Sequence, residues 1–364
     1  MPASTPGTVS VHRLGQSIWV DNITRTMLDD GTLARYIADW AVTGLTSNPT
    51  IFEKAIAGGK AYDASIRALL AKGLGGEKLF FKLAIEDLTR AADLFRPIHR
   101  DTQGVDGWVS LEVSPLLAND TAATIAQARE LHAQAGRNNL FIKVPGTPEG
   151  LPAIEQLIFD GIPVNVTLLF DREQYLAAAD AYLKGLERRL AKGLDLKVCS
   201  VASLFVSRWD KATAAKLPAD LKNRLGIAMA ERCYKAFCDL KNSTRFQKLK
   251  AAGARPQRLL FASTGVKDPS LAGDYYVQAL AAPDTVNTMP EETLQATAKS
   301  STAAKAQRDD GGDCEGMLAR ITKAGVDVAR LGADLQVEGR DSFDKSWSEL
   351  LSNIESKTAS LAAR

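Results

Sequence analysis

The sequence has 364 residues, enough for two average domains or one large barrel, and length alone does not decide between them. Hydrophobic residues make up 45% of the chain, which is ordinary for a protein with a full core, and the formal net charge is only +2. Because acidic and basic residues are interspersed, this charge pattern argues against nucleic acid as a partner. It leaves open small phosphorylated molecules, which need only one or two placed cations.

Neither the cysteines nor the histidines suggest a metal site. The cysteines lack the paired spacing of zinc ligands and are too few for a disulfide framework, so we expect reduced thiols, at Cys199, Cys233, Cys238 and Cys314. The N-terminus lacks the charged flank and apolar stretch of a signal peptide, and no apolar run is long enough to span a bilayer. We therefore expect a cytoplasmic protein with no metal or other cofactor and no membrane partner.

Short apolar segments alternate with helical patterns along the chain. After a tail at residues 1–16, which we expect to be flexible, strands are predicted at 17–20, 42–46, 108–113, 140–144, 162–167, 197–201, 258–263 and 285–288. Helical patterns cover 28–40, 49–97 with a break at 73–76, 120–135, 149–160, 172–191, 206–251 and 317–364 with a break near Gly339. Asn48 and Asp120 have the residue types and positions of helix caps.

This alternation predicts right-handed βαβ units and a parallel sheet. Eight short strands fit a closed (β/α)8 TIM barrel of the α/β class, with additional N- and C-terminal helices, in one domain that spans 1–364. An open doubly wound sheet is the alternative, but no Gly-x-Gly-x-x-Gly opens the first βα turn, so a dinucleotide-binding fold has no support.

The strand at 140–144 contains Lys143, just before a Pro-Gly turn. Lysine is rarely buried in full, so this one is either a solvated residue at the strand end or an amine kept away from water for chemistry. Removal from water drives a lysine toward its neutral, nucleophilic form, which is how Schiff-base lysines are made. The strand alone does not choose between these interpretations.

Polar residues close one predicted strand after another, at the end of a barrel where active sites lie. They are Asp21, Asn48, Glu112, Lys143, Asn165 with Thr167, Ser203 and Ser263. Each has a structural explanation on its own, as a helix cap, a turn former, a paired charge or a good strand residue. Together they surround one amine with two carboxylates, which is the set that imine chemistry requires: a nucleophile, and acids and bases for the proton transfers.

The chain resembles the transaldolase family across nearly its full length. The matching segments are Trp19-Val20-Asp21, residues 45–50 (LTSNPT), 110–113 (SLEV), 141–144 (FIKV), 165–170 (NVTLLF) and 203–208 (SLFVSR). The later segments at 262–268, 285–290 and 335–339 are similar to a longer bacterial branch of the family. The family's fold is a (β/α)8 barrel, in agreement with the strand count.

The resemblance implies a role for each matching residue. Lys143 would be the Schiff-base nucleophile and Asp21 the acid/base for carbon–carbon bond cleavage and formation. Glu112 and Thr167 would hold the water that shuttles protons. Substrate contacts would come from Asn48, Asn165, Ser203, Phe205 and Arg208, with Arg208 on the phosphate.

One position departs from the family pattern. Many transaldolases have Ser-Phe-Arg after the seventh strand, whereas this chain has Ala262-Ser263-Thr264 and then Lys267. We expect Ser263 and Lys267 to line the substrate site and Lys267 to replace the second phosphate-binding arginine. Lysine carries its charge on one nitrogen and lacks the planar guanidinium of arginine, so we expect it to bind the phosphate with a different geometry.

The activity implied is transfer of a dihydroxyacetone unit between sugar phosphates in the pentose phosphate pathway. In this reaction sedoheptulose 7-phosphate and glyceraldehyde 3-phosphate give erythrose 4-phosphate and fructose 6-phosphate. We expect the enzyme to be a monomer or homodimer. Two alternatives stand beside it. A fructose 6-phosphate aldolase of the same superfamily typically has glutamine in place of Glu112 and tyrosine in place of Phe205, and this chain has the transaldolase residue at both. A non-catalytic barrel that binds sugar phosphate would not need Lys143 and both carboxylates.

Overall fold

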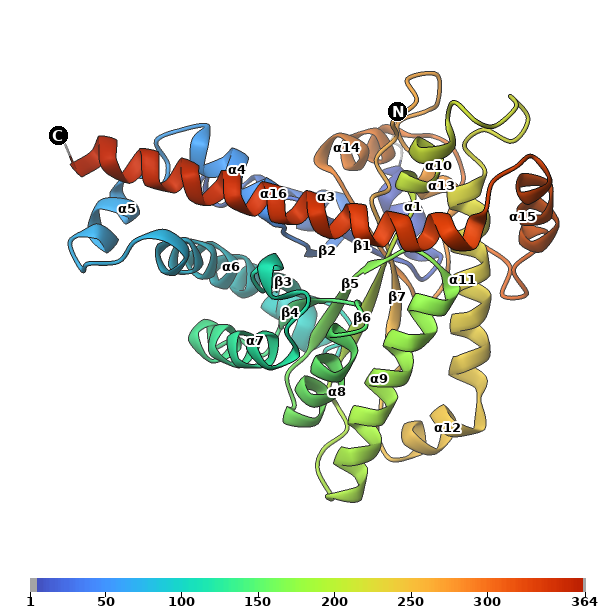
Figure 1. The fold of residues 1–364 in the computed structure, drawn as a ribbon, viewed down its shortest axis with the longest axis horizontal. Coiled ribbons are helices and arrows are strands. Elements are labelled where there is room, and N and C mark those ends of the chain that lie inside the picture. Colours follow the sequence, from blue (N-terminus) through green and yellow to red (C-terminus); the bar gives the residue numbers. More distant parts are fainter. Residues whose placement is uncertain (1–4, 363–364) are drawn as a thin grey trace.

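The computed structural model describes residues 5–362, and within them eight parallel strands form a barrel at the centre of the molecule (Figure 1). The strands are β1 (Ser17–Val20), β2 (Val42–Leu45), β3 (Val109–Glu112), β4 (Leu140–Pro145), β5 (Val164–Leu169), β6 (Ser200–Phe205), β7 (Arg258–Ala262) and β8 (Val286–Met289). Their order is β2-β1-β8-β7-β6-β5-β4-β3. A parallel bridge between Gly44 and Trp108, with a 2.9 Å bond from Leu45 N–H to the Trp108 carbonyl, joins the two end strands and closes the ring. The predicted (β/α)8 barrel is confirmed.

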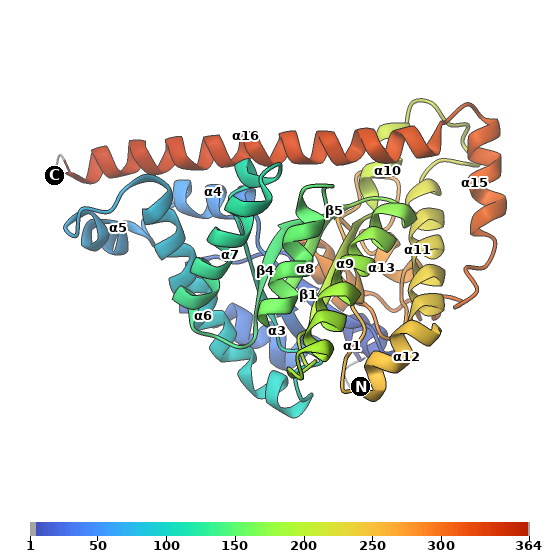
Figure 2. The ribbon, with the colours of Figure 1, turned by 60° about the horizontal axis from the view of Figure 1, so that its bottom comes forward.

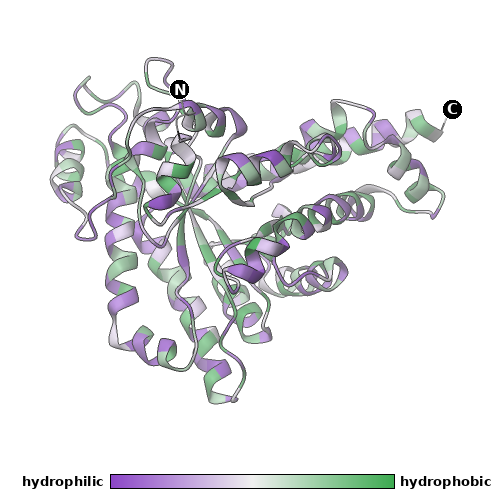
Figure 3. Cartoon of the chain, turned by 180° about the vertical axis from the view of Figure 1, so that it is seen from behind, coloured by the Kyte–Doolittle hydropathy of each residue, from purple (hydrophilic) through white to green (hydrophobic). Residues whose placement is uncertain are grey.

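Helices surround the barrel and follow the strands. They are α1 (Gly7–Arg13), α2 (Arg25–Asp29), α3 (Thr32–Trp40), α4 (Pro49–Ala57), α5 (Asp63–Leu70), α6 (Gly76–Asp101), the 3-10 turn η1 (Pro115–Leu117), α7 (Thr121–Ala135), α8 (Gly150–Asp160), α9 (Arg172–Ala191), α10 (Ser207–Thr213), α11 (Leu225–Asn242), α12 (Thr244–Ala251), α13 (Tyr275–Ala279), α14 (Glu291–Lys299), α15 (Cys314–Lys323) and α16 (Val328–Ala362). Their surfaces alternate between polar and apolar (Figure 3), because one face packs on the strands and the other meets water. Among residues 5–362, no helix has the length and apolar character needed to cross a membrane.

The predicted helix caps are confirmed. Asn48 precedes Pro49, and its side chain accepts a hydrogen bond from Ile51 N–H at 3.1 Å. Asp120 accepts from Ala123 N–H at 2.9 Å. These bonds satisfy backbone donors that have no partner within the helix, so the sequence signal and the local energetics agree.

The N-terminal segment differs from the prediction of a flexible tail at 1–16. Residues 1–4 lie outside the described residues, but Gly7–Arg13 form helix α1, which packs against α14. Thr8 and Val11 are fully buried there. The prediction was wrong for this part because a short helix with few apolar residues leaves almost no periodic signal.

Two strands differ from their predicted bounds by two or more residues at each end. The fifth strand was predicted to begin at Ile162, but it begins after Pro163, which has no N–H to donate to the sheet. The sixth was predicted at 197–201 with Ser203 beyond its end, whereas β6 runs from Ser200 to Phe205. Ser203 is therefore a buried residue within the strand, where its hydroxyl has a side-chain partner inside the barrel.

Helix α6 continues past the predicted end at Pro97 to Asp101. Tertiary packing outweighs the proline here: the His99 ring lies edge-on to Trp108 with centroids 4.8 Å apart, which anchors the last turn against β3.

The C-terminal helix passes over one end of the barrel, as Figure 2 shows, and contacts α4, β5 and α10. The break predicted near Gly339 is absent, because α16 is continuous from Val328 to Ala362. The chain turns earlier instead, at Gly325, whose φ of 97° suits glycine. The long helix is thereby positioned across the carboxyl ends of the strands.

Candidate active site

The carboxyl ends of the strands surround a cavity of about 170 Å³. Most of the predicted site residues line it together: Asp21, Asn48, Lys143, Ser203, Phe205, Arg208, Ser263 and Lys267. The remaining three, Glu112, Asn165 and Thr167, are buried in the strands beside or below it. The structure thus brings the predicted residues to one end of the barrel, including two carboxylates next to one amine.

Lys143 is a buried lysine with few partners. It extends from β4, its side chain is 6% exposed, and its Nζ lies 3.2 Å from Glu112 Oε2 and 3.2 Å from the Ser47 carbonyl oxygen. Of the two interpretations made from the sequence, the solvated strand end is excluded. The amine is held in a site largely screened from water, with a carboxylate placed to accept or return its proton.

Both carboxyls have raised pKa values. Burial raises the pKa of Asp21, while the nearby charge of Lys143 and a 2.6 Å hydrogen bond from Thr46 Oγ1 act in the opposite direction. Burial also raises the pKa of Glu112, opposed by Lys143, and the charge of Asp21 raises it further. The two acids and the amine form a coupled set, in which the charge of one group changes the proton affinity of the others.

A hydrogen-bonded row of side chains includes Asn165, the register partner of Lys143 on β5. Asn165 Nδ2 donates to Ser110 Oγ at 3.1 Å, and Ser203 Oγ donates to Asn165 Oδ1 at 2.7 Å. The row fixes which way the Asn165 amide points, because its oxygen accepts from Ser203. The second N–H of that amide is left without a partner among residues 5–362, and a substrate hydroxyl could accept it.

Thr167 has an unusual environment. It is 0% exposed, yet its Oγ1 has no hydrogen-bond partner in the described part of the chain. The strand is irregular at this point: the register of β5 against β6 shifts between Val166 and Leu169, and Leu168 has a φ of 59°. A buried hydroxyl without a protein partner, next to a backbone distortion, is typical of a functional site more than of a structural one.

Arg208 offers a guanidinium with no protein acceptor. No hydrogen bond or ion pair of its side chain is found within residues 5–362, and burial lowers its pKa while Glu338 acts against this. Its guanidinium carbon lies 5.0 Å from the centre of the Phe205 ring, so this ring packs against the guanidinium group. The five donors are therefore available to a doubly charged anion.

Lys267 and Ser263 lie at the rim of the same cavity. Lys267 is exposed and is unpaired in the described chain, while Ser263 has a φ of 54° and its hydroxyl is 3.0 Å from that of Ser207. A second cation thus faces the cavity, but from a flexible, solvated side chain.

Two residues of the site were missed from the sequence. Thr46 Oγ1 is 2.6 Å from Asp21 Oδ1 and 2.7 Å from Thr288 Oγ1, so it orients the Asp21 carboxyl. Its position directly after β2, where other strands also end in polar residues, could have indicated that it belongs to the site. Phe343 of α16 lies over the cavity, with its ring centre 5.8 Å from Lys143 Nζ and 6.0 Å from the Arg208 guanidinium carbon. No local pattern marks Phe343, because its role depends on where the long helix lies.

Within residues 5–362, no three His, Cys, Asp or Glu side chains are grouped as metal ligands would be. The described cavity and its surroundings contain an amine, two carboxyls, amides, hydroxyls and cations.

The chain is similar to known proteins of one family. The family model described as Transaldolase/Fructose-6-phosphate aldolase matches residues 18–354. A protein named Transaldolase from Saccharopolyspora erythraea is 44% identical over 347 residues, covering 93% of this chain and 94% of its own. Another from Thermobifida fusca is 44% identical over 354 residues, covering 95% and 96%. A Transaldolase 2 from Nostoc punctiforme is 40% identical over 374 residues, covering 97% and 98%.

Proposed function

The chain belongs to the transaldolase/fructose-6-phosphate aldolase family, and on this basis we propose that it transfers a dihydroxyacetone unit between ketose and aldose phosphates. It is an enzyme, a transferase of the transaldolase kind that acts on sugar phosphates. Its reaction is that of the pentose phosphate pathway, in which sedoheptulose 7-phosphate and glyceraldehyde 3-phosphate give erythrose 4-phosphate and fructose 6-phosphate.

The proposed first stage is imine formation on Lys143. A proton passes from the ammonium to Glu112, and the neutral amine attacks the ketone carbon to give a carbinolamine. The protonated Glu112 returns the proton to the departing hydroxyl, so that water and a protonated imine result. The 3.2 Å contact between Nζ and the carboxylate carries this proposal, because burial alone would leave the amine without a proton acceptor. The partnerless hydroxyl of Thr167 supports a water relay beside Glu112.

Asp21 is the proposed base for bond cleavage. Its carboxylate takes the proton of the hydroxyl on the far carbon of the bond that breaks. That carbon becomes the aldehyde carbon, and the electrons of the broken bond move into the imine to form an enamine. The first aldose phosphate then leaves. In the second half the enamine carbon attacks the acceptor aldehyde, and Asp21 returns its proton to the new alkoxide. The raised pKa of Asp21 supports this role, since an acid that holds its proton more tightly is a better base for a hydroxyl.

The proposed substrate contacts divide between the two ends of the sugar. Asn48, Asn165 and Ser203 face the dihydroxyacetone unit, and Arg208, with Lys267 and Ser263 at the rim, binds the phosphate. Asn48 caps α4 through its oxygen, which leaves its amide N–H groups for the substrate. Transfer rather than release requires that water be kept from the intermediate, and the Phe205 and Phe343 rings beside the amine support this.

Borohydride trapping tests the nucleophile. We expect fructose 6-phosphate and borohydride to add a reduced dihydroxyacetone unit to the peptide that contains Lys143, detected by mass spectrometry. The Lys143→Ala variant should fold, lose turnover and give no adduct, whereas Lys184→Ala, at an exposed lysine on α9, should behave as the wild type. An adduct on another lysine, or comparable transfer by Lys143→Ala, would refute the assignment.

We also propose that the protein works in the cytoplasm as a monomer or homodimer, with 1–364 forming one barrel domain. The packing of α16 across β5 and against both α4 and α10 supports a single unit, because that helix joins distant parts of the chain. Light scattering on the eluted protein measures the mass, and a larger assembly would contradict this proposal.

A further inference from the structure

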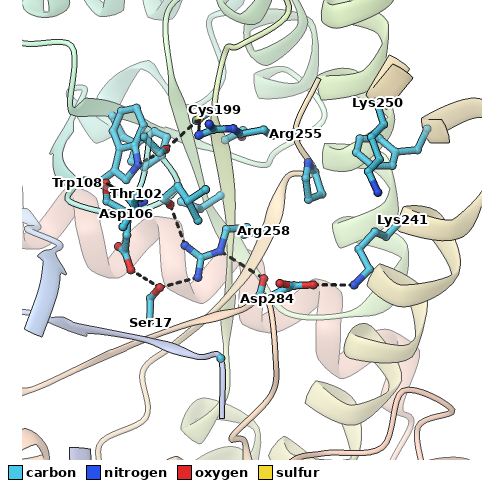
Figure 4. Close-up of a pocket in the computed structure, with 18 of the residues that line it drawn as sticks. Ser17, Thr102, Asp106, Trp108, Cys199, Lys241, Lys250, Arg255, Arg258 and Asp284 are labelled. Atoms are coloured by element: carbon cyan, nitrogen blue, oxygen red, sulfur yellow. Dashed lines mark hydrogen bonds and ion pairs between the residues drawn. The ribbon is translucent and has the colours of Figure 1, made fainter. Parts of the chain in front are cut away.

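The two ends of the barrel are fastened in different ways. At the amino-terminal end, Arg258, which begins β7, donates to the hydroxyl of Ser17, which begins β1, and to the Thr285 carbonyl just before β8 (Figure 4). These bonds join the strands directly. At the carboxyl-terminal end, where the proposed active site lies, one tie comes from outside the barrel, from the side chain of Gln336 on α16.

Gln336 bonds to the backbone of two neighbouring strands. Its Nε2 donates to the Leu168 carbonyl of β5 at 2.9 Å and to the Gly146 carbonyl, directly after β4, at 3.1 Å. An amide nitrogen carries two N–H groups, so it can serve both carbonyls at once. Because both partners are acceptors, they fix the orientation of the amide. Gln336 therefore spans the ends of two strands of the proposed active site.

The part of β5 that Gln336 holds is irregular. The register against β6 shifts between Val166 and Leu169, so that Thr167 and Leu168 together lie opposite the single residue Ser203. Two residues opposite one form a β-bulge, a distortion that redirects a side chain and is common beside active sites. Leu168 has a φ of 59°, a left-handed conformation that persists in a leucine only where its surroundings hold it.

Helix α16 holds this bulge in two ways. Gln336 bonds to the backbone of Leu168, and the helix also packs on the Leu168 side chain at Gly339, where a Cβ would lie 3.0 Å from Leu168 Cδ2. Gln336, Gly339 and Phe343 are spaced by three and four residues, so they lie on one face of the helix. The face of α16 that places a ring over Lys143 is therefore also the face that holds the bulge.

The second carbonyl bonded by Gln336 belongs to the same junction. Gly146 N–H donates to the Thr167 carbonyl at 2.7 Å, so the end of β4 is bonded to the bulge. A Cβ at position 146 would lie 3.1 Å from Val166 Cγ1 and would overlap the Leu169 side chain. Glycine thus lets β4 lie directly against β5, and Gln336 joins the two strands at the point where they are closest to its helix.

Thr167 lies within this junction. Its carbonyl accepts from Gly146, and the next carbonyl along the chain accepts from Gln336. Its buried hydroxyl, by contrast, has no hydrogen-bond partner among residues 5–362. A hydroxyl without a hydrogen bond to the protein is directed only by the backbone that carries it and by the packing of its methyl group. The direction of the Thr167 hydroxyl therefore depends on the geometry of the bulge.

We propose that Gln336 is a positioning residue: by holding the Leu168 carbonyl, it directs the Thr167 hydroxyl toward the water relay beside Glu112. This inference rests on the proposed function, and within it on the relay. Gln336 lies outside the lining of the active-site cavity, so its effect is exerted through the backbone of β5.

Removal of the two N–H donors tests this role. Gln336→Met keeps the length of the side chain, and Gln336→Ala is a second variant with high helix propensity. For transfer from fructose 6-phosphate to erythrose 4-phosphate, we expect each to lower kcat by about tenfold, as loss of one hydrogen bond does, and to change KM by less than about twofold. The rate at which borohydride traps the imine in single-turnover mixtures should fall by the same factor, because the relay serves imine formation.

A matched control removes a different tie of the same helix. Asn353 of α16 donates from Nδ2 to Glu53 Oε1 on α4 at 2.7 Å, and neither residue takes part in the junction. Asn353→Leu should therefore keep the kcat of the wild type. Thermal unfolding of each variant shows that it is folded before rates are compared.

A double-mutant cycle shows whether Gln336 acts through Thr167. Thr167→Val has no hydroxyl to direct, so adding Gln336→Met to it should change kcat by less than about twofold. A side chain that only attached α16 to the barrel, or acted through Gly146 and β4, would cost about tenfold in both backgrounds.

The outcomes separate this inference from the function on which it rests. Wild-type kcat in folded Gln336→Met or Gln336→Ala, an equal loss in Asn353→Leu, or a further tenfold loss in the Thr167→Val background would each overturn the role of Gln336 and leave the proposed function intact. Wild-type kcat in Thr167→Val would refute the relay and this inference together. A wild type that neither transfers dihydroxyacetone nor gives a Lys143 adduct would refute the proposed function itself, and the inference with it.

Discussion

The hydroxyl of Thr167 permits a direct test of the proposed water relay, because one substitution separates that role from a structural one. The residue is fully buried, and its Oγ1 lacks a partner in the described chain. Valine has nearly the shape of threonine without the hydroxyl, so Thr167→Val removes only the polar group. A buried hydroxyl without a partner costs roughly 1–3 kcal/mol, so the variant should be no less stable than the wild type and up to that much more stable.

The same substitution should damage catalysis. A group that positions a proton-carrying water contributes about 10²- to 10⁴-fold to the rate, and we expect kcat for transfer from fructose 6-phosphate to erythrose 4-phosphate to fall within that range. Urea unfolding gives the stability and a coupled assay of released glyceraldehyde 3-phosphate gives the rate. Thr167→Ser keeps the hydroxyl and loses one methyl, so it should retain most activity and lose about 1 kcal/mol. Wild-type turnover by Thr167→Val would refute the relay, and a valine variant less stable than the serine variant would show that the hydroxyl is structural.

Three further predictions concern the carboxyl, the phosphate cation and the aromatic cover. Because burial raises the pKa of Asp21, its contribution to stability is present below the unfolded-state pKa of about 3.9 and is lost as pH rises through the folded-state value. The free energy of unfolding of Asp21→Asn, measured in urea, should therefore rise relative to that of the wild type as the pH increases from acid to neutral. A difference that stays constant with pH would contradict this. In the same variant we expect the imine to form and bond cleavage to stall. In steady-state kinetics, Arg208→Lys should raise KM for phosphorylated substrates by about tenfold or more, with a smaller change in kcat. The reason is that lysine cannot form the two parallel hydrogen bonds that a guanidinium forms with a phosphate. An unchanged KM would show that Arg208 does not bind the phosphate. Phe343→Ala should increase the share of dihydroxyacetone released to water relative to the share transferred, measured by product analysis with and without erythrose 4-phosphate, and an unchanged share would show that the ring does not exclude water.

The barrel and the buried amine of Lys143 were predictable from the sequence for local reasons. Each strand is a short apolar run buried on both faces, and its end is marked by a turn or a helix cap. Asn48 illustrates this, because its cap geometry follows from Pro49 alone. Lys143 was noticeable because a charged residue interrupts an apolar run, and strand topology then brings it beside Glu112, its register partner on β3.

The misses have a common physical cause, which is that tertiary contacts decided the outcome. Ser203 was taken as a strand terminator because serine is polar, but its hydroxyl is satisfied inside the barrel by Asn165. Helix α1 was missed because it packs against α14, almost three hundred residues away in the chain, and has no local apolar repeat. Phe343 was missed for the same reason, since nothing near it in the sequence indicates which surface its helix covers.

Gly339 shows most clearly how local rules and packing oppose each other. Glycine in a helix costs about 1 kcal/mol relative to alanine, which is why a break was predicted there. In the structure, a Cβ at this position would lie 3.0 Å from Leu168 Cδ2 and 3.2 Å from Arg208 Nη1. The missing side chain lets α16 approach the strand ends, and one turn further along the helix Phe343 is brought over Lys143. Glycine at position 339 thus weakens the helix locally, but it allows the helix to pack close to the strand ends. This close packing places the Phe343 ring over Lys143.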